Sequence, residues 1–211
     1  MNRREPQIHQ YVAALAIATL LFFGGLWFGN HLSEKKLDVI DTLGRNLQLA
    51  TLGSELQYEL LAHEPCSAVN ASSLIDELFR IGTRLDFMES ELGVNDPQVL
   101  ELKEYYHLLE IRHWLLMRKV QNECSLNTHF ILYFYSNAGD CERCDEQGSV
   151  LTYLHRKYQD LNIYSFDIHI DNPALVTVRE LYGVEEAPTL VVDGTKVESF
   201  KTSQEIEELL Q

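Results

Sequence analysis

Two of the four cysteines in this chain, Cys141 and Cys144, are separated by only two residues. Cysteines at this spacing form a reversible disulfide, provide half of a zinc site, or lie close together without a shared role. Acidic residues flank the pair at Asp140, Glu142, Asp145 and Glu146. They disfavour the thiolate that exchange chemistry needs, whereas Arg143 between the cysteines favours it, so the sequence leaves the balance open.

The segments on either side of the pair predict where it lies in a fold. Phe130 to Tyr135 is short, rich in aromatic and β-branched residues and apolar on both faces, which is typical of a strand covered on each side. After the pair, apolar residues recur at helical spacing: Val150, Leu151, Leu154 and Tyr158. Cys141 would then lie at or just before a helix N-terminus, where exposed N–H groups favour a thiolate.

The remaining segments predict a mixed fold. Ile163 to Ile170 indicates a second strand, and Asn172-Pro173 begins a helix that ends near Gly183. Two short strands are expected around an Asp193-Gly194 turn, followed by a last helix that starts with a capping box at Thr202. The predicted order is β-α-β-α-β-β-α.

This order resembles the thioredoxin-like family, with Cys141-x-x-Cys144 after the first strand and Ala187-Pro188-Thr189 opening the third. The resemblance covers about Thr128 to Gln211. It implies that Cys141 attacks and that Cys144 resolves the mixed disulfide. It also implies that Pro188 is cis and that Ala187, Pro188 and Thr189 present backbone to an extended substrate.

The chain also departs from the best-known members of that family. They carry Trp-Cys-Gly-Pro-Cys, whereas Asp140-Cys-Glu-Arg-Cys stands here, after a turn that is about two residues longer. Tyr133 falls near the strand position where thioredoxin keeps a buried carboxylate for proton transfer. The alternative interpretation is a thioredoxin-like domain that serves as a scaffold, with a purely structural disulfide.

Near the N-terminus, Tyr11 to Gly29 contains no charged residue. As a helix it would extend about 28 Å, close to the thickness of a bilayer core, which predicts a transmembrane helix in contact with membrane lipid. A cleaved signal peptide is the alternative. Arg3 and Arg4 precede the segment, which favours a cytoplasmic N-terminus and an extracytoplasmic remainder.

Between these regions, Leu32 to Glu123 keeps helical periodicity throughout. The pattern predicts one helix to about Ala62, a second that Gly93 ends and a third from Pro97, arranged as a three-helix bundle or coiled-coil stalk. His113 lies on the apolar stripe of the third helix. We interpret it as a partnered core histidine rather than a metal ligand.

The other two cysteines, Cys66 and Cys124, follow the ends of the first and third predicted helices. An up-down-up arrangement brings both to the same end of the bundle, so we expect a structural disulfide and an oxidising compartment. A zinc site with His63 is the alternative, but it has no clear fourth ligand.

The whole chain has 211 residues and a formal net charge of -15. Without a basic patch or a nucleic-acid motif, this charge argues against a nucleic-acid partner. The predicted fold class is an N-terminal transmembrane helix, a helical bundle or stalk, and a thioredoxin-like domain. The predicted domains cover residues 1–30, 31–126 and 127–211.

The predicted function is that of a membrane-anchored thiol-disulfide oxidoreductase. It would act on extracytoplasmic protein thiols or disulfides through Cys141 and Cys144, without a metal or cofactor. The alternative is a non-enzymatic scaffold or interaction subunit of a membrane complex, in which the bundle binds a membrane partner protein.

Overall fold

The computed structural model describes residues 12, 14–26, 52–53, 55–68 and 72–210. The chain divides into two compact units, Met1–Gln57 and Tyr58–Gln211. All described residues of the first unit are helical, and their side chains are exposed. The predicted site residues all lie in the second unit, so its fold is the one that positions them.

The first unit contains the segment that the sequence predicts to be a transmembrane helix. Among the described residues, no helix is both long and apolar enough to cross a membrane. The prediction of a transmembrane helix over Tyr11 to Gly29 is therefore wrong. Tyr11, Ala13 and residues 27–29 of the predicted segment lie outside the described residues.

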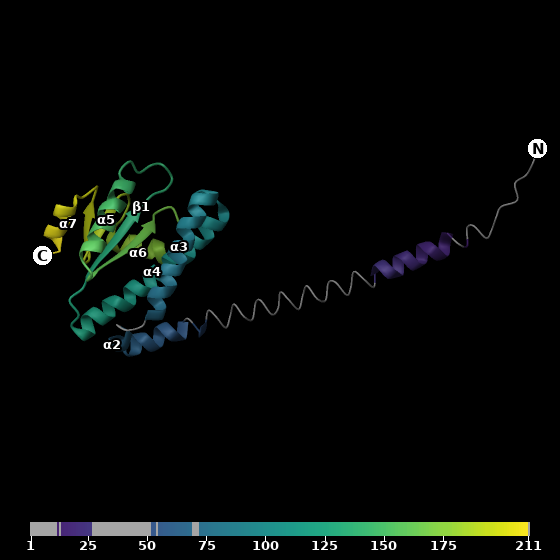
Figure 1. The fold of residues 1–211 in the computed structure, drawn as a ribbon, viewed down its shortest axis with the longest axis horizontal. Helices are drawn as coiled ribbons and strands as arrows, with labels where there is room; N and C mark the ends of the chain where they lie inside the picture. Colours follow the sequence, from purple (N-terminus) through teal and green to yellow (C-terminus); the bar gives the residue numbers. More distant parts are fainter. Residues whose placement is uncertain (1–11, 13, 27–51, 54, 69–71, 211) are drawn as a thin grey trace, which may run out of the picture. The chain divides into compact units, whose positions relative to one another are not determined.

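A mixed sheet lies among the helices of the second unit (Figure 1). It has four strands, in the order β2-β1-β3-β4. Strand β1 (His129–Tyr135) pairs in parallel with β2 (Leu161–Asp167) and antiparallel with β3 (Thr189–Val192). Strand β4 (Thr195–Glu198) pairs antiparallel with β3 and forms the other edge.

Three helices complete this part of the chain: α5 (Cys144–Lys157), α6 (Pro173–Tyr182) and α7 (Ser203–Leu209). The β-α-β-α-β-β-α order predicted from the sequence is confirmed. Local signals explain it, since Asn172 caps α6 and Thr202 forms a capping box with Glu205 at the start of α7.

Strand β1 is buried on both faces, as its apolar sequence predicts. Phe130, Leu132 and Phe134 belong to a core that α4 and α6 complete, whereas Ile131 and Tyr133 belong to a core that α5 and α7 complete. This double burial fixes the end of β1, from which the turn that carries the two cysteines departs.

The helical region packs directly onto the sheet. Helices α3 (Ser72–Leu92) and α4 (Pro97–Cys124) pack against each other. From α4, Ile111 and Trp114 enter the same core as Phe134. Helix α4 therefore shares a core with the sheet. Whether residues 31–126 and 127–211 fold independently, as the predicted domain limits require, stays a prediction.

Side chains of α4 also cover the outer edge of β2. The Ser165 N–H donates to Glu110 Oε1 at 3.0 Å, and the Asp167 N–H donates to His107 Nε2 at 3.2 Å. Because His107 Nε2 accepts a hydrogen bond, its Nδ1 carries the proton and faces Glu110 Oε2 at 3.2 Å. These contacts satisfy backbone groups that an edge strand would otherwise expose.

The structure joins Cys66 and Cys124 in a disulfide, with their Cα atoms 5.6 Å apart. Cys66 lies on the short helix α2 (Pro65–Ala68), and Cys124 is the last residue of α4.

Among the described residues, no group of three or more histidine, cysteine or acidic side chains is placed to hold a metal ion. His113 is buried and its Nδ1 lies 2.9 Å from the Tyr164 hydroxyl, as expected of a partnered core histidine.

Candidate active site

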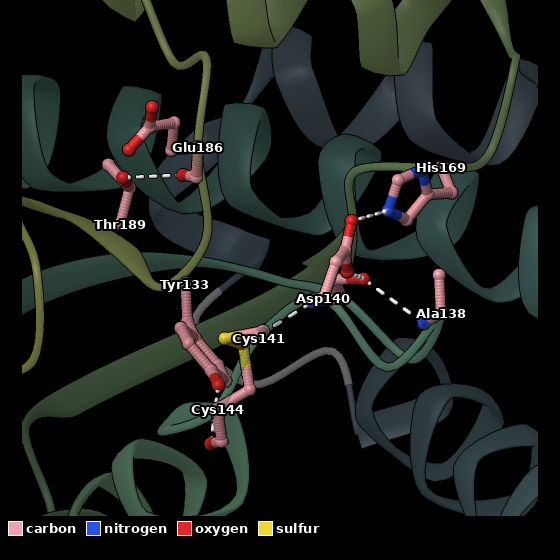
Figure 2. Close-up of a disulfide and its surroundings, with 9 residues drawn as sticks. Tyr133, Ala138, Asp140, Cys141, Cys144, His169, Glu186 and Thr189 are labelled. Carbon is pink, nitrogen blue, oxygen red and sulfur yellow. Dashed lines mark hydrogen bonds and ion pairs between the residues drawn. A yellow bond between two sulfur atoms is a disulfide. The ribbon is translucent and has the colours of Figure 1, made fainter.

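Cys141 and Cys144 form a disulfide at the end of β1, with their Cα atoms 5.5 Å apart (Figure 2). Helix α5 begins at Cys144, so Cys141 lies in the turn that precedes the helix. Cys141 is half-buried, whereas Cys144 is only 5% exposed. A reactant that approaches from solvent can therefore reach the Cys141 sulfur more easily than the Cys144 sulfur.

Two groups from the β1 end of the turn hold Cys144. The Ser136 N–H donates to Cys144 Sγ at 3.4 Å, and the Tyr133 hydroxyl donates to the Cys144 carbonyl at 2.6 Å (Figure 2). Burial raises the pKa of Tyr133 above its usual range, so this hydroxyl remains a neutral donor. Cys144 is therefore fixed to the central strand.

The acidic residue before Cys141 bridges two loops. Asp140 accepts a hydrogen bond from the Ser136 hydroxyl, which itself accepts one from the Ala138 N–H at 3.1 Å. The other carboxylate oxygen of Asp140 lies 3.0 Å from His169 Nε2. Figure 2 shows Asp140 turned toward His169, away from the sulfurs. The Ser136 hydrogen bond is the largest cause that lowers the pKa of Asp140, and His169 contributes in the same direction.

The loop that carries His169 is anchored by the helical region. Asp167 accepts a hydrogen bond from the His169 N–H at 3.0 Å, and its other oxygen lies 3.5 Å from the fully buried ammonium group of Lys103. Lys103 also pairs with Glu89 of α3 at 2.6 Å, in an ion pair that is not aligned as a hydrogen bond. A chain of polar contacts thus joins α3 and α4 to residues 136–143, the segment between β1 and α5 that carries Cys141, which we call the redox turn.

The charge of Arg143, between the cysteines, is compensated within the helix start. Its guanidinium donates two hydrogen bonds of 2.9 Å to the carboxylate of Glu146. This pairing raises the pKa of Arg143 and lowers the pKa of Glu146. The same guanidinium lies over the ring of Phe200, 3.5 Å from the ring centroid. Arg143 is therefore held against the segment that follows β4.

The Ala187–Pro188 peptide bond is cis, which is the geometry that the resemblance implies. Ala187 and Pro188 are half-buried, whereas Thr189 is buried and its hydroxyl donates to the Glu186 carbonyl at 2.7 Å (Figure 2). A crevice of about 430 Å³ lies between this loop, the redox turn and the segment after β4. The residues that line it are Glu142, Arg143, Glu185, Glu186, Ala187, Pro188, Thr189, Glu198, Ser199 and Phe200. The loop predicted to bind substrate and the turn between the cysteines thus share one crevice.

Two features of this site could not be read from the sequence. The predicted second strand ran to Ile170, which placed His169 inside a strand, whereas β2 ends at Asp167 and leaves His169 in a loop. The contact of Phe200 with Arg143 joins residues 57 positions apart and has no local signal. Both features depend on tertiary packing.

Comparison with solved structures returns several thioredoxins. Thioredoxin O2 from Arabidopsis thaliana in the oxidized state is 23% identical and covers 40% of this chain and 73% of its own, with a TM-score of 0.32. Thioredoxin NaTrxh from Nicotiana alata is 22% identical and covers 46% of this chain and 82% of its own, with a TM-score of 0.35. The germline-specific thioredoxin Deadhead from Drosophila melanogaster is 22% identical, with coverages of 44% and 90% and a TM-score of 0.32.

No protein-family model matches the chain. A search of curated proteins finds no match either. The fold is assigned from strand order and connectivity rather than from these similarity scores. The sheet order β2-β1-β3-β4, the helical connections and the cis-proline before β3 are those of a thioredoxin-like fold.

Proposed function

We propose that this protein is a thiol-disulfide oxidoreductase that acts on protein thiols or disulfides through Cys141 and Cys144. The observation that carries the proposal is the unequal burial of two bonded cysteines, whose two intervening residues line a crevice. Cys141 is half-buried and Cys144 is 5% exposed. Exchange chemistry requires one sulfur that a partner can reach and a second that is shielded until it is needed.

The reaction proceeds by two thiolate attacks. A substrate thiolate attacks the Cys141 sulfur, the bond between Cys141 and Cys144 breaks, and Cys144 leaves as a thiolate. A second substrate thiolate then attacks the substrate sulfur of the mixed disulfide and releases Cys141 as a thiolate. The substrate loses two electrons and two protons and gains a disulfide, while the pair is reduced to two thiols. The same steps in reverse reduce a substrate disulfide.

The surroundings of Cys144 suit its role as the leaving and resolving sulfur. The Ser136 N–H points at Cys144 Sγ, and a hydrogen bond to a sulfur strengthens when that sulfur becomes negative. Tyr133 holds the Cys144 carbonyl, so the sulfur stays within reach of Cys141 throughout the reaction. Substrate backbone would lie along Ala187, Pro188 and Thr189, which face the turn across the crevice.

We also propose that the second unit, Tyr58–Gln211, lies outside the cytoplasm, in an oxidising compartment. The disulfide between Cys66 and Cys124 supports this location, because structural disulfides persist mainly in such compartments. The partners would then be extracytoplasmic protein thiols or disulfides.

The acidic surroundings favour a reducing pair over a strongly oxidising one. Asp140 and Glu142 flank Cys141, and the charge of Arg143 is already engaged by Glu146. Negative charge disfavours the Cys141 thiolate, and strongly oxidising pairs depend on a stabilised reduced form.

A redox titration tests the proposal. The protein is equilibrated with glutathione or dithiothreitol buffers of graded potential, and free thiols at Cys141 and Cys144 are quantified by alkylation and mass spectrometry. We expect reversible interconversion near the potential of thioredoxins, about -270 mV, while Cys66 and Cys124 remain bonded. If the pair stays oxidised in buffers that also begin to open the second disulfide, the scaffold interpretation is correct.

A further inference from the structure

The crevice beside the redox pair is strongly acidic. Four exposed glutamates line it: Glu142, Glu185, Glu186 and Glu198. They come from three separate segments, namely the redox turn, the loop before Pro188 and strand β4. A substrate chain that crosses the crevice on its way to Cys141 must therefore pass negative charge on each of its walls.

The cations nearby do not neutralise this crevice. Arg143 is paired with Glu146, which lies outside the crevice lining. Lys196 pairs with Glu198 at 2.7 Å and also donates to the Gly183 carbonyl. Among the described residues, no salt bridge involves Glu142, Glu185 or Glu186. Glu142 interacts electrostatically with Arg143, which also lines the crevice but forms its salt bridge with Glu146. The glutamates therefore outnumber the cations of the crevice lining.

We infer that the substrate of this site is a protein segment that carries lysine or arginine next to its reactive cysteine. The inference rests on the proposed function, because the crevice matters only if exchange occurs at Cys141. Each exposed ion pair changes affinity by about two- to fivefold, so three glutamates together give a preference of about tenfold or more. The net charge of -15 acts in the same direction, by raising the encounter rate with basic segments.

A basic substrate would also act on the chemistry. Asp140 and Glu142 oppose the negative charge that Cys141 acquires as a thiolate. A lysine or arginine brought beside Cys141 by the substrate offsets that charge during the exchange. The acidic flanks therefore slow reaction with acidic or neutral thiols and are compensated when a basic segment binds.

The test uses three peptides that share one internal disulfide and differ only in having lysine, glutamine or glutamate beside the cysteines. The rate of exchange with the wild-type protein, reduced at Cys141 and Cys144 and still bonded at Cys66 and Cys124, is measured at about 0.02 M and about 1 M salt. Each rate is divided by the rate of the same peptide with dithiothreitol, which corrects for the reactivity of the peptide itself. We expect the lysine peptide to react at least tenfold faster than the glutamate peptide at low salt, and the difference to shrink severalfold at high salt.

A charge-matched pair of variants assigns the effect to the crevice. The triple variant Glu142→Gln, Glu185→Gln, Glu186→Gln should lose most of the preference for the lysine peptide. The control variant Glu91→Gln, Glu101→Gln, Glu208→Gln changes the net charge equally at exposed positions outside the crevice and should keep it. Equal preference in both variants would overturn the inference, because the overall charge would then explain the selectivity.

A small neutral disulfide, 2-hydroxyethyl disulfide, separates this inference from the proposed function. If it exchanges at Cys141 of the wild-type protein but the three peptides react equally, the inference is wrong and the function stands. If neither it nor any peptide exchanges at Cys141, the proposed function fails, and the inference fails with it.

Discussion

At the scale of residues, the site depends on the different surroundings of its two sulfurs. Cys144 is held by Ser136 and Tyr133 from the end of β1, whereas Cys141 is half-buried and follows a charged aspartate. Ser136 and His169 fix the carboxylate of Asp140 in an orientation away from the sulfurs, but its negative charge still belongs to the residue next to Cys141. We therefore expect the charge of Asp140 to disfavour thiolate formation at Cys141.

The variant Asp140→Asn tests that role. Asparagine keeps an oxygen for the Ser136 hydroxyl but removes the charge, so the reduced pair should react about two- to fivefold faster with iodoacetamide at pH 7. Alkylation at Cys141 is followed by mass spectrometry over a range of pH. The control Asp76→Asn removes an exposed charge from α3 and should leave the rate unchanged. A rate for Asp140→Asn equal to that of the wild type would show that Asp140 does not act on the thiol.

The bonded cysteines and the cis-proline could be predicted because their signals are local. The Cys141-x-x-Cys144 spacing, the apolar strand before it and the Ala187-Pro188 pair are each contained in a few consecutive residues. His169 could not be predicted in the same way. Its role depends on where β2 ends and on a contact with Asp140, 29 residues earlier in the chain.

At the scale of elements, α4 makes contacts with strand β2 that were not predicted from the sequence. Its apolar stripe predicted packing against other helices, but Lys103, His107 and Glu110 are also buried on it. Their partners include backbone or side-chain groups at or near the end of β2, 55 or more residues away, which no periodicity reveals. Because β2 is an edge strand, α4 acts as the cover of that edge.

The variant His107→Leu tests whether this cover stabilises the fold. It leaves the Asp167 N–H without an acceptor in a buried position, so the free energy of unfolding should fall by about 1–3 kcal/mol. Urea denaturation measures the change. Glu110→Gln serves as the comparison, because glutamine retains an oxygen for the Ser165 N–H and should cost less. An equal or smaller loss for His107→Leu would contradict the assigned hydrogen bond.

Burial of His113 predicts a pH-dependent stability. Burial lowers the pKa of His113 to about 4, whereas an unfolded histidine titrates at about 6.5. Below about pH 6.5 the unfolded chain binds a proton at this residue that the folded protein does not bind. The free energy of unfolding therefore falls as the pH decreases from about 6.5 to about 4.

The variant His113→Gln isolates this effect and keeps a polar partner for Tyr164. The decrease in the free energy of unfolding between pH 7 and pH 5 should be smaller in the variant than in the wild type, by about 2 kcal/mol. Denaturation curves at both pH values give this difference. His63→Gln, at an exposed position, should keep the pH dependence of the wild type. An equal decrease in the free energy of unfolding in His113→Gln and the wild type would show that His113 does not cause the pH dependence.

At the scale of the whole molecule, the disulfide between Cys66 and Cys124 ties α2 to the end of α4. It closes a loop over a sequence separation of 58 residues, for which the chain-entropy model gives a stabilisation of about 4 kcal/mol. We expect Cys66→Ala with Cys124→Ala to lower the free energy of unfolding by up to this amount. The comparison is made in a background with Cys141→Ser and Cys144→Ser, so that one disulfide alone is varied. A change of less than about 1 kcal/mol would show that this link contributes little to stability.

The overall organisation was predicted only in part. The order of elements after residue 127 followed from strand and helix signals that agree with one another, and the structure confirms it. The transmembrane prediction rested on the absence of charge from Tyr11 to Gly29, whereas no helix among the described residues is both long and apolar enough to cross a membrane. The packing of α4 on the sheet required contacts between distant segments, which a helical stripe does not specify.

The most direct test of the central claim is a trapping measurement with the single variants Cys144→Ser and Cys141→Ser. Each reduced variant is mixed with a disulfide-bonded protein, and covalent adducts are mapped by mass spectrometry. We expect a stable mixed disulfide on Cys141 in Cys144→Ser, because the resolving sulfur is missing, and no adduct on Cys144 in Cys141→Ser. Absence of any adduct in Cys144→Ser, or equal adducts on both cysteines, would show that Cys141 is not the attacking thiol.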